Sequence, residues 1–190
     1  MDPLWTDLVN SDWHDHRGSG RREDRIGNDA WLARFLARAG WSARRLPGAV
    51  DRDRLRALRR LLRGVVDRLL SDQAVPARDL AALNRCLAAF PQVQRLEERE
   101  GGLSLTAAPV AGGIERVLGA VALSFADLLA HGDPSRIKVC ANPDCRWVLY
   151  DASRNRTRRW CEGAVCGSLI KVRHFRSRRR ARRALPPPLA

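Results

Sequence analysis

Hydrophobic positions follow the period of an α-helix through four parts of this chain. They recur three or four residues apart, the spacing that places side chains on one helix face. The segments with this pattern are residues 28–39, 51–70, 76–90 and 114–131. Pro76 is suited to the first turn of the third helix, and we expect the fourth, the most apolar, to form the centre of the core.

Residues 93–107 have a different pattern. They read as two strands around a Gly101-Gly102 turn, with clean alternation of apolar and polar residues in the second strand. An isolated hairpin is only marginally stable in water. We therefore expect the apolar face of this hairpin to cover the helices.

The first segment, residues 4–13, is apolar and rich in tryptophan. Asp7 and Asn10 lie within it and are candidates for lining a small-ligand pocket. His14 and His16 begin a loop of Gly, Ser and Arg residues, where we expect exposed, solvated side chains. A role for the two histidines as metal ligands is the alternative.

Arginines occupy the polar face of the 51–70 helix and are accompanied by Asp51, Asp53 and Asp67. We interpret this row as a solvated, charge-balanced face, with phosphate binding as the alternative. Together the patterns predict a mainly α fold with a small β-hairpin, of the α+β class. The helical domain is expected over residues 1–134, a smaller module over 135–184, and a proline-rich tail over 185–190.

Charge separates the two parts. The chain of 190 residues has a net charge of +14, and residues 136–190 contain 15 basic and three acidic side chains. Such a concentration of positive charge indicates a polyanionic partner, most commonly nucleic acid. A solvated basic tail is the simpler alternative. The sequence has no signal-peptide pattern and no membrane-spanning run, so we expect a cytoplasmic, nucleoid-associated protein that does not contact membranes.

The module contains two cysteine pairs with the same C-x4-C spacing: Cys140 with Cys145, and Cys161 with Cys166. In a reducing compartment this pattern favours metal over disulfide. Four thiolates complete a tetrahedral Zn²⁺ site and leave no position for a reacting water, so one structural zinc ion is predicted. Cys161 must precede the following helix or lie at its very start, with Cys166 in an early turn, because five positions within a regular helix would rotate the two thiols apart. Cys86 stands apart and reads as a small core residue.

The helix after Cys166 carries basic side chains on two adjacent faces. We expect contacts to nucleic acid from these residues: Lys171, Arg173, Arg176, Arg178, Arg179, Arg180 and Arg182. An apolar stripe also runs along this helix through Val165, Leu169 and Val172, with Phe175 near its edge, and we expect Leu169 to pack against the body.

The motif Cys-Ala-Asn-Pro-Asp-Cys, the Asp-x-Ser-Arg-Asn-Arg-x-Arg-Arg-Trp-Cys run and the final Cys-Gly resemble the CGNR zinc-finger family of bacterial proteins, over about residues 137–179. The segment 7–11 and the order of the later elements are similar to the ABATE domain that accompanies this finger. The resemblance implies a treble-clef-like finger, stress-linked transcription regulation, the four cysteines as zinc ligands and a basic connecting loop. That loop contains Arg154, Arg156, Arg158 and Arg159. The chain has Ser168-Leu169 where the family has Asn-Arg, so a contact made by that Arg is absent here.

Three functions remain to be compared. The first is a zinc-dependent, DNA-binding transcriptional regulator whose helical body senses a signal or forms a homodimer. The second is an adaptor whose zinc module docks on a protein partner such as RNA polymerase or another transcription factor. The third, an enzyme, is not expected, because the sequence shows no catalytic triad, paired carboxylates, phosphate-binding loop or open metal site.

Overall fold

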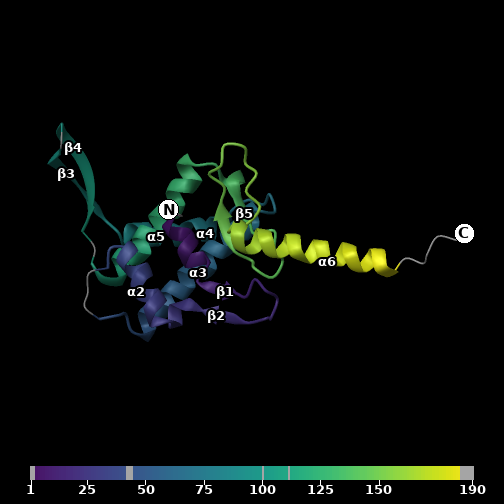
Figure 1. Cartoon of the computed structure of the whole chain (residues 1–190). Coiled ribbons are helices and arrows are strands. Elements are labelled where there is room, and N and C mark those ends of the chain that lie inside the picture. The colour runs from purple at the N-terminus through teal and green to yellow at the C-terminus, as the bar shows by residue number, and fades with distance from the viewer. Residues whose placement is uncertain (1–2, 42–44, 100, 111, 185–190) are drawn as a thin grey trace, which may run out of the picture.

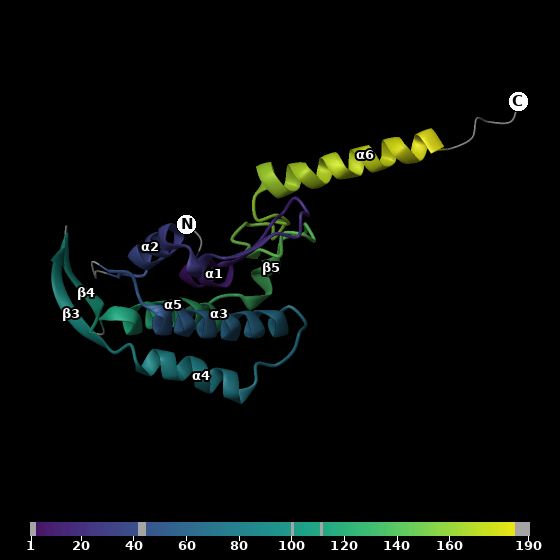
Figure 2. The ribbon, with the colours of Figure 1, turned by 90° about the horizontal axis from the view of Figure 1, so that it is seen from below.

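A computed structural model describes residues 3–41, 45–99, 101–110 and 112–184, with side chains up to Arg180. The predicted tail 185–190 and the side chain of Arg182 lie outside this description. The body contains the helices α1 (Leu4–Val9), α2 (Asp29–Arg38), α3 (Ala49–Leu69), α4 (Ala77–Ala88) and α5 (Gly113–His131). In Figure 2, α3 and α5 run side by side, with α4 along one side of the pair. None of the described helices is long and apolar enough to cross a membrane.

Helix α5 forms the centre of the core, as its apolar sequence predicts. Val117, Val121 and Phe125 are completely buried on it, and the ring of Trp5 from α1 lies 5.1 Å from that of Phe125. Helix α4 contacts α5 through Phe90, which follows α4 and packs onto Gly119. A Cβ at Gly119 would approach Phe90 to 2.1 Å, so a glycine is required there.

The helix ends follow local chemistry. The side chain of Asn28 accepts the Trp31 N–H at 3.0 Å and caps α2, while Gly40 follows α2 with a φ of +81°. Pro76 is the residue immediately before α4, so this helix begins one residue later than the sequence predicts. The short 3-10 segments η1 (Arg25–Gly27) and η2 (Pro134–Arg136) connect helices to strands.

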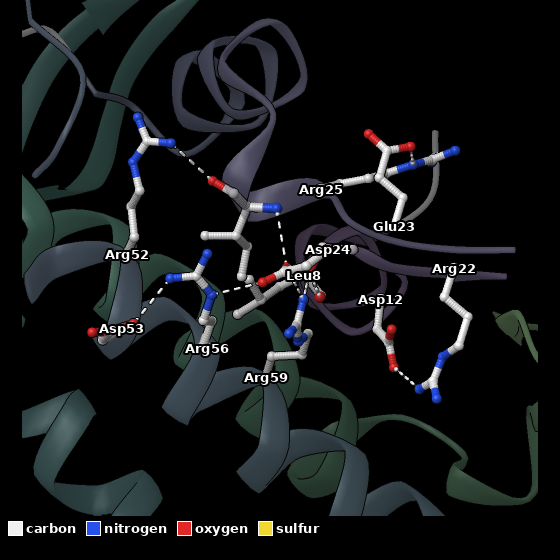
Figure 3. A network of polar contacts seen from close by, with 12 residues as sticks. Leu8, Asp12, Arg22, Glu23, Asp24, Arg25, Arg52, Asp53, Arg56 and Arg59 are labelled. Atoms are coloured by element: carbon white, nitrogen blue, oxygen red, sulfur yellow. Dashed lines mark hydrogen bonds and ion pairs between the residues drawn. The ribbon is translucent and has the colours of Figure 1, made fainter. Parts of the chain in front are cut away.

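The arginine row of α3 forms ion pairs with acids of the N-terminal segment (Figure 3). Arg56 and Arg59 both contact the carboxylate of Asp24 at 2.6 Å, and Arg52 contacts Asp29 at 2.8 Å. The charge-balanced interpretation is therefore confirmed for these arginines. Their partners include Asp24 and Asp29, in addition to the acids of α3 that the sequence suggested.

The loop around His14 and His16 is not fully exposed, so that expectation is wrong. It connects β1 (Asp12–His14) and β2 (Arg22–Asp24), a small antiparallel hairpin in which Trp13 is opposite Glu23. Both histidine side chains are half-buried. The strands have only three residues each, too few for alternation to be recognised in the sequence.

The second hairpin consists of β3 (Gln92–Arg99) and β4 (Gly102–Pro109), with Leu96 opposite Leu105. Its existence is confirmed, but the expectation that it covers the helices is wrong. Figures 1 and 2 show it extending away from the helical body. Leu96, Leu103 and Leu105 remain 66%, 73% and 67% exposed. Alternation identifies the two faces of a strand but does not reveal whether another layer lies against either of them.

The C-terminal module contains β5 (Ile137–Val139), β6 (Val148–Tyr150), a π-helical turn η3 (Gly163–Gly167) and α6 (Ser168–Ala184). Strands β5 and β6 pair antiparallel, with Lys138 opposite Leu149. Ile137 and Val148 belong to the same buried cluster as Trp5 and Phe125. The body and the module therefore share one hydrophobic core.

Candidate metal centre and basic surface

Strands β5 and β6 position the first cysteine pair. The Cys140 N–H donates to the Trp147 carbonyl at 2.8 Å, and the Cys145 N–H donates to the Asn142 carbonyl at 3.0 Å. Arg146 completes the turn with a φ of +55°, the left-handed conformation that reverses the chain toward β6. These bonds close a knuckle that presents both thiols to the same side.

The second pair is placed by the start of the C-terminal helix. Cys161 precedes the helical turn η3, and Cys166 lies within it, with its N–H donating to the Glu162 carbonyl at 3.0 Å. This is the arrangement that the spacing predicts. Gly167 lies against Trp160, where a Cβ would approach the indole ring to 3.1 Å.

The four cysteines form one cluster, with all their sulfur atoms within 4.8 Å of one another. Two of the Sγ–Sγ distances are 3.6 Å, between Cys145 and Cys161, and 3.5 Å, between Cys161 and Cys166. A tetrahedral zinc ion with Zn–S bonds of 2.3 Å would separate its sulfur ligands by about 3.8 Å. The donor set and its spacing therefore fit one zinc ion. With four protein thiolates such an ion would be structural, and it would stabilise a segment that has little core of its own.

Crowding perturbs the thiols. Cys145 shares a sulfur–sulfur hydrogen bond with Cys161, and this contact lowers the pKa of Cys145 to about 5. The same contact with Cys145 raises the pKa of Cys161 well above its usual range, and burial raises the pKa of Cys166 to about 11. One thiolate forms readily, and further thiolates require a compensating positive charge. A divalent cation supplies that charge.

The N-terminal hairpin contributes to the surroundings of the cluster, which the sequence did not indicate. The buried side chain of Asn142 donates to the His16 carbonyl at 2.8 Å and lies 3.5 Å from the Cys166 sulfur. Arg173 of α6 donates to Asp144 and to the Arg17 carbonyl, both at 2.7 Å. Among the described residues, the candidate metal-ligand group contains the four cysteines and neither His14 nor His16.

Asp151 organises the loop between the two cysteine pairs. This buried carboxylate accepts hydrogen bonds from Lys138 at 2.6 Å, from the Ser153 hydroxyl at 2.5 Å and from the Arg158 N–H at 3.0 Å. The hydrogen bond from Lys138 has the largest effect on the pKa of the Asp151 carboxyl, and the bond from Ser153 the next largest. Together they hold this pKa well below its usual range. The loop is thereby fixed on its inner side.

The four loop arginines have different environments. Arg154 is exposed, and Arg156 forms an ion pair with Asp133 at 2.9 Å. The Arg159 guanidinium lies 5.4 Å from the centre of the Trp160 ring. Arg158 donates to the carbonyls of Tyr150, Trp160 and Cys161, so its guanidinium serves the loop itself. The structure therefore leaves three of the four arginines on the outer side.

Helix α6 extends away from the body as a single rod (Figures 1 and 2). Five of its predicted contact residues are exposed: Lys171, Arg176, Arg178, Arg179 and Arg180. Arg173 is half-buried in the contacts described above. Leu169, which the sequence led us to expect against the body, is half-buried, whereas Val172 and Phe175 are 46% and 58% exposed.

Asp7 and Asn10, which the sequence suggested as lining one pocket, make different contacts in the structure. Asp7 forms an ion pair with Arg38. The side chain of Asn10 is buried and bonds both backbone groups of Val148, donating to its carbonyl and accepting its N–H at 2.8 Å. Asn10 also lines a cavity of about 590 Å³ between α3, the β1–β2 hairpin and the knuckle. Arg59, Arg60, Arg63 and Arg146 line the same cavity.

This combination of features defines a class: a helical body joined through a common core to a treble-clef-like zinc finger with four cysteines. Residues 2–132 match the model of the ABATE family, described as "putative stress-induced transcription regulator", and residues 136–179 match the CGNR zinc finger. The chain therefore belongs to the ABATE family and carries a CGNR zinc finger. No match was found among curated proteins.

Proposed function

We propose that this protein is a zinc-dependent transcriptional regulator that binds DNA through the connecting loop and α6. The observation that carries this proposal is the row of exposed cations on α6 next to the four-cysteine cluster. The zinc ion would fix the start of α6 and the ends of the connecting loop, so that the exposed arginines are presented in one orientation. Arg154 and Arg159 would extend the basic surface from α6 onto the loop.

The test is a titration of fluorescent duplex DNA with zinc-loaded protein at several salt concentrations. A variant with Lys171, Arg178 and Arg180 changed to Gln should bind more weakly and reduce the log–log salt slope by about 0.9 for each lost phosphate contact. The matched control removes three exposed arginines from the body, Arg78, Arg85 and Arg95, and should retain the original slope.

The zinc dependence is tested with the double variant Cys161→Ser, Cys166→Ser, which should lose most of the affinity while the Cys86→Ser control keeps it. If intact protein does not bind duplex DNA at low salt, the proposed function is wrong. Equal binding by the double variant would separate DNA binding from the zinc site and would contradict the role given to the metal.

We also propose the cavity at Asn10 as the place where the body receives its signal. Arg60 and Arg146 line it, and neither forms an ion pair within the described part of the chain, so an anionic small molecule is the expected ligand. Melting shifts across a panel of phosphorylated and carboxylated metabolites, with Arg60→Gln and Arg146→Gln as comparisons, would test this assignment. If the metabolites raise the melting temperature of the variants as much as that of the original protein, this assignment is wrong.

The second candidate function is an adaptor that contacts a protein of the transcription machinery. It is favoured by the exposed leucines of β3 and β4, because an exposed apolar surface of this kind fits a protein partner and has no complement in DNA phosphates. A pull-down with and without nuclease treatment separates the two functions. Protein partners that persist after the DNA is removed would support the adaptor function. Recovery of untagged copies together with tagged ones would show that the protein also forms a homodimer.

A further inference from the structure

Helix α6 combines its basic residues with an exposed apolar stripe, and the proposed contacts to phosphate do not explain this stripe. Val172 and Phe175 are separated by one helical turn and are 46% and 58% exposed, and half-buried Leu169 continues their line toward the zinc site. Exposed valine and phenylalanine on a projecting helix indicate a surface that a partner covers.

The charges beside the stripe identify that partner. At 100° per residue, Lys171 and Arg178 lie about 100–120° to one side of Val172, and Arg173 and Arg180 lie about 80–100° to the other. Of these four, Arg173 is engaged with Asp144, and the other three are exposed. The stripe is thus a narrow apolar line between two cationic rows. A second copy of α6 would be repelled by the same charges.

The major groove of duplex DNA has the matching arrangement. It is wide enough for an α-helix, its two walls carry the phosphates, and its floor presents the thymine methyl groups, which are absent from the minor groove. We propose that α6 lies in the major groove, with Val172 and Phe175 against thymine methyls and the flanking cations toward the phosphates. This inference rests on the proposed DNA-binding function and adds the groove and the base feature that the helix contacts.

Farther along the same line, Arg176 and Arg179 lie within about 40° of the stripe centre, while Arg180 lies on its flank. Arg176 and Arg179 are exposed, so they can reach base edges beyond the part of α6 that carries Val172 and Phe175. Arginine binds guanine on this edge of the base pair. The order along α6 therefore predicts a site with thymines toward the zinc-bound end and guanine toward the distal end.

The experiment compares two 20-base-pair duplexes of A·T pairs that differ only in carrying thymine or uracil, which removes the methyl group. Intact zinc-loaded protein should bind the thymine duplex more tightly, by about fourfold for each contacted methyl. Val172→Ala and Phe175→Ala should bring the ratio of the two Kd values close to one and leave the salt slope unchanged. Leu103→Ala, at a more exposed apolar site on the hairpin, should keep the ratio of the original protein.

Circular dichroism confirms that the two α6 variants remain folded. Tight, salt-dependent binding of intact protein with equal affinity for both duplexes would overturn the inference and leave the proposed function intact. Absence of binding to either duplex would contradict the proposed function itself. If the ratio is one and Phe175→Ala instead alters sedimentation or binding to anionic lipid vesicles, the stripe belongs to a second copy or to a lipid surface, and the inference is wrong.

Discussion

At the scale of single residues, Asn10 links the two ends of the chain. Its amide satisfies both the N–H and the carbonyl of Val148, across 138 positions of sequence. Asn10→Ala would leave two backbone groups unpaired in a buried position. We expect a loss of about 2–4 kcal/mol in the free energy of unfolding, measured by urea denaturation.

Asn84→Ala is the control for this prediction, because Asn84 is exposed on α4. It should change the free energy of unfolding by less than about 0.5 kcal/mol. An Asn10→Ala protein as stable as this control would show that water replaces the lost amide.

Asp151 gives the connecting loop a pH dependence. Because its pKa is lowered in the folded protein, mainly by Lys138, its contribution to stability is full above about pH 4, the region of an unperturbed Asp. It is lost as the pH falls toward the lowered native value. The difference in Tm between the original protein and Asp151→Asn should therefore be largest near neutral pH and shrink in acid. A difference that stays constant with pH would contradict the assignment.

At the scale of elements, α5 and the β3–β4 hairpin represent opposite extremes of burial. Phe125 on α5 is completely buried, so Phe125→Ala should cost about 3–5 kcal/mol of unfolding free energy. Leu103 on β4 is 73% exposed, and Leu103→Ser should change the same quantity by less than about 0.5 kcal/mol. Denaturation of both variants in one buffer tests the pair. A large cost for Leu103→Ser would place a covering layer on the hairpin.

The elements that sequence predicts well are those whose periodicity extends over several turns. The pattern of α5 is long and apolar. The helix was predicted over residues 114–131, and in the structure it begins one residue earlier, at Gly113, and ends at His131. The β1–β2 hairpin was not predicted, because three-residue strands give no period. The exposed face of β4 was wrongly expected to cover the helices, since an apolar stripe shows which residues face one way without showing what they face.

At the scale of the whole molecule, the metal site and the helical body are coupled through Ile137 and Val148. Removing zinc should unfold the finger and expose these two residues, which together are worth about 3–6 kcal/mol of buried surface. We expect the remaining body to melt at a lower temperature after treatment with a chelator, followed by calorimetry. Readdition of Zn²⁺ should restore the Tm, and a body that melts at the same temperature with or without zinc would contradict a shared core.

The candidate metal site was the most predictable part of the whole molecule. Four cysteines in matched pairs specify their ligand chemistry almost independently of the rest of the chain, and the structure places all four sulfur atoms together. The hydrogen bond from Asn142 to the His16 carbonyl spans 126 positions, and no local pattern in the sequence could reveal it. The inward position of Arg158 was also hidden, because charge alone does not distinguish an arginine that binds carbonyls from one that faces solvent.

The bond between Asn10 and Val148 also has a consequence for synthesis. The ribosome makes Asn10 near the beginning and Val148 only after every helix of the body, so the body emerges while this buried amide has no partner. Chains generally fold from the N-terminal side as they are made. The nascent body must therefore wait for β6 before its first helix is locked in place, and a message truncated before the finger would release a body that cannot complete its own core.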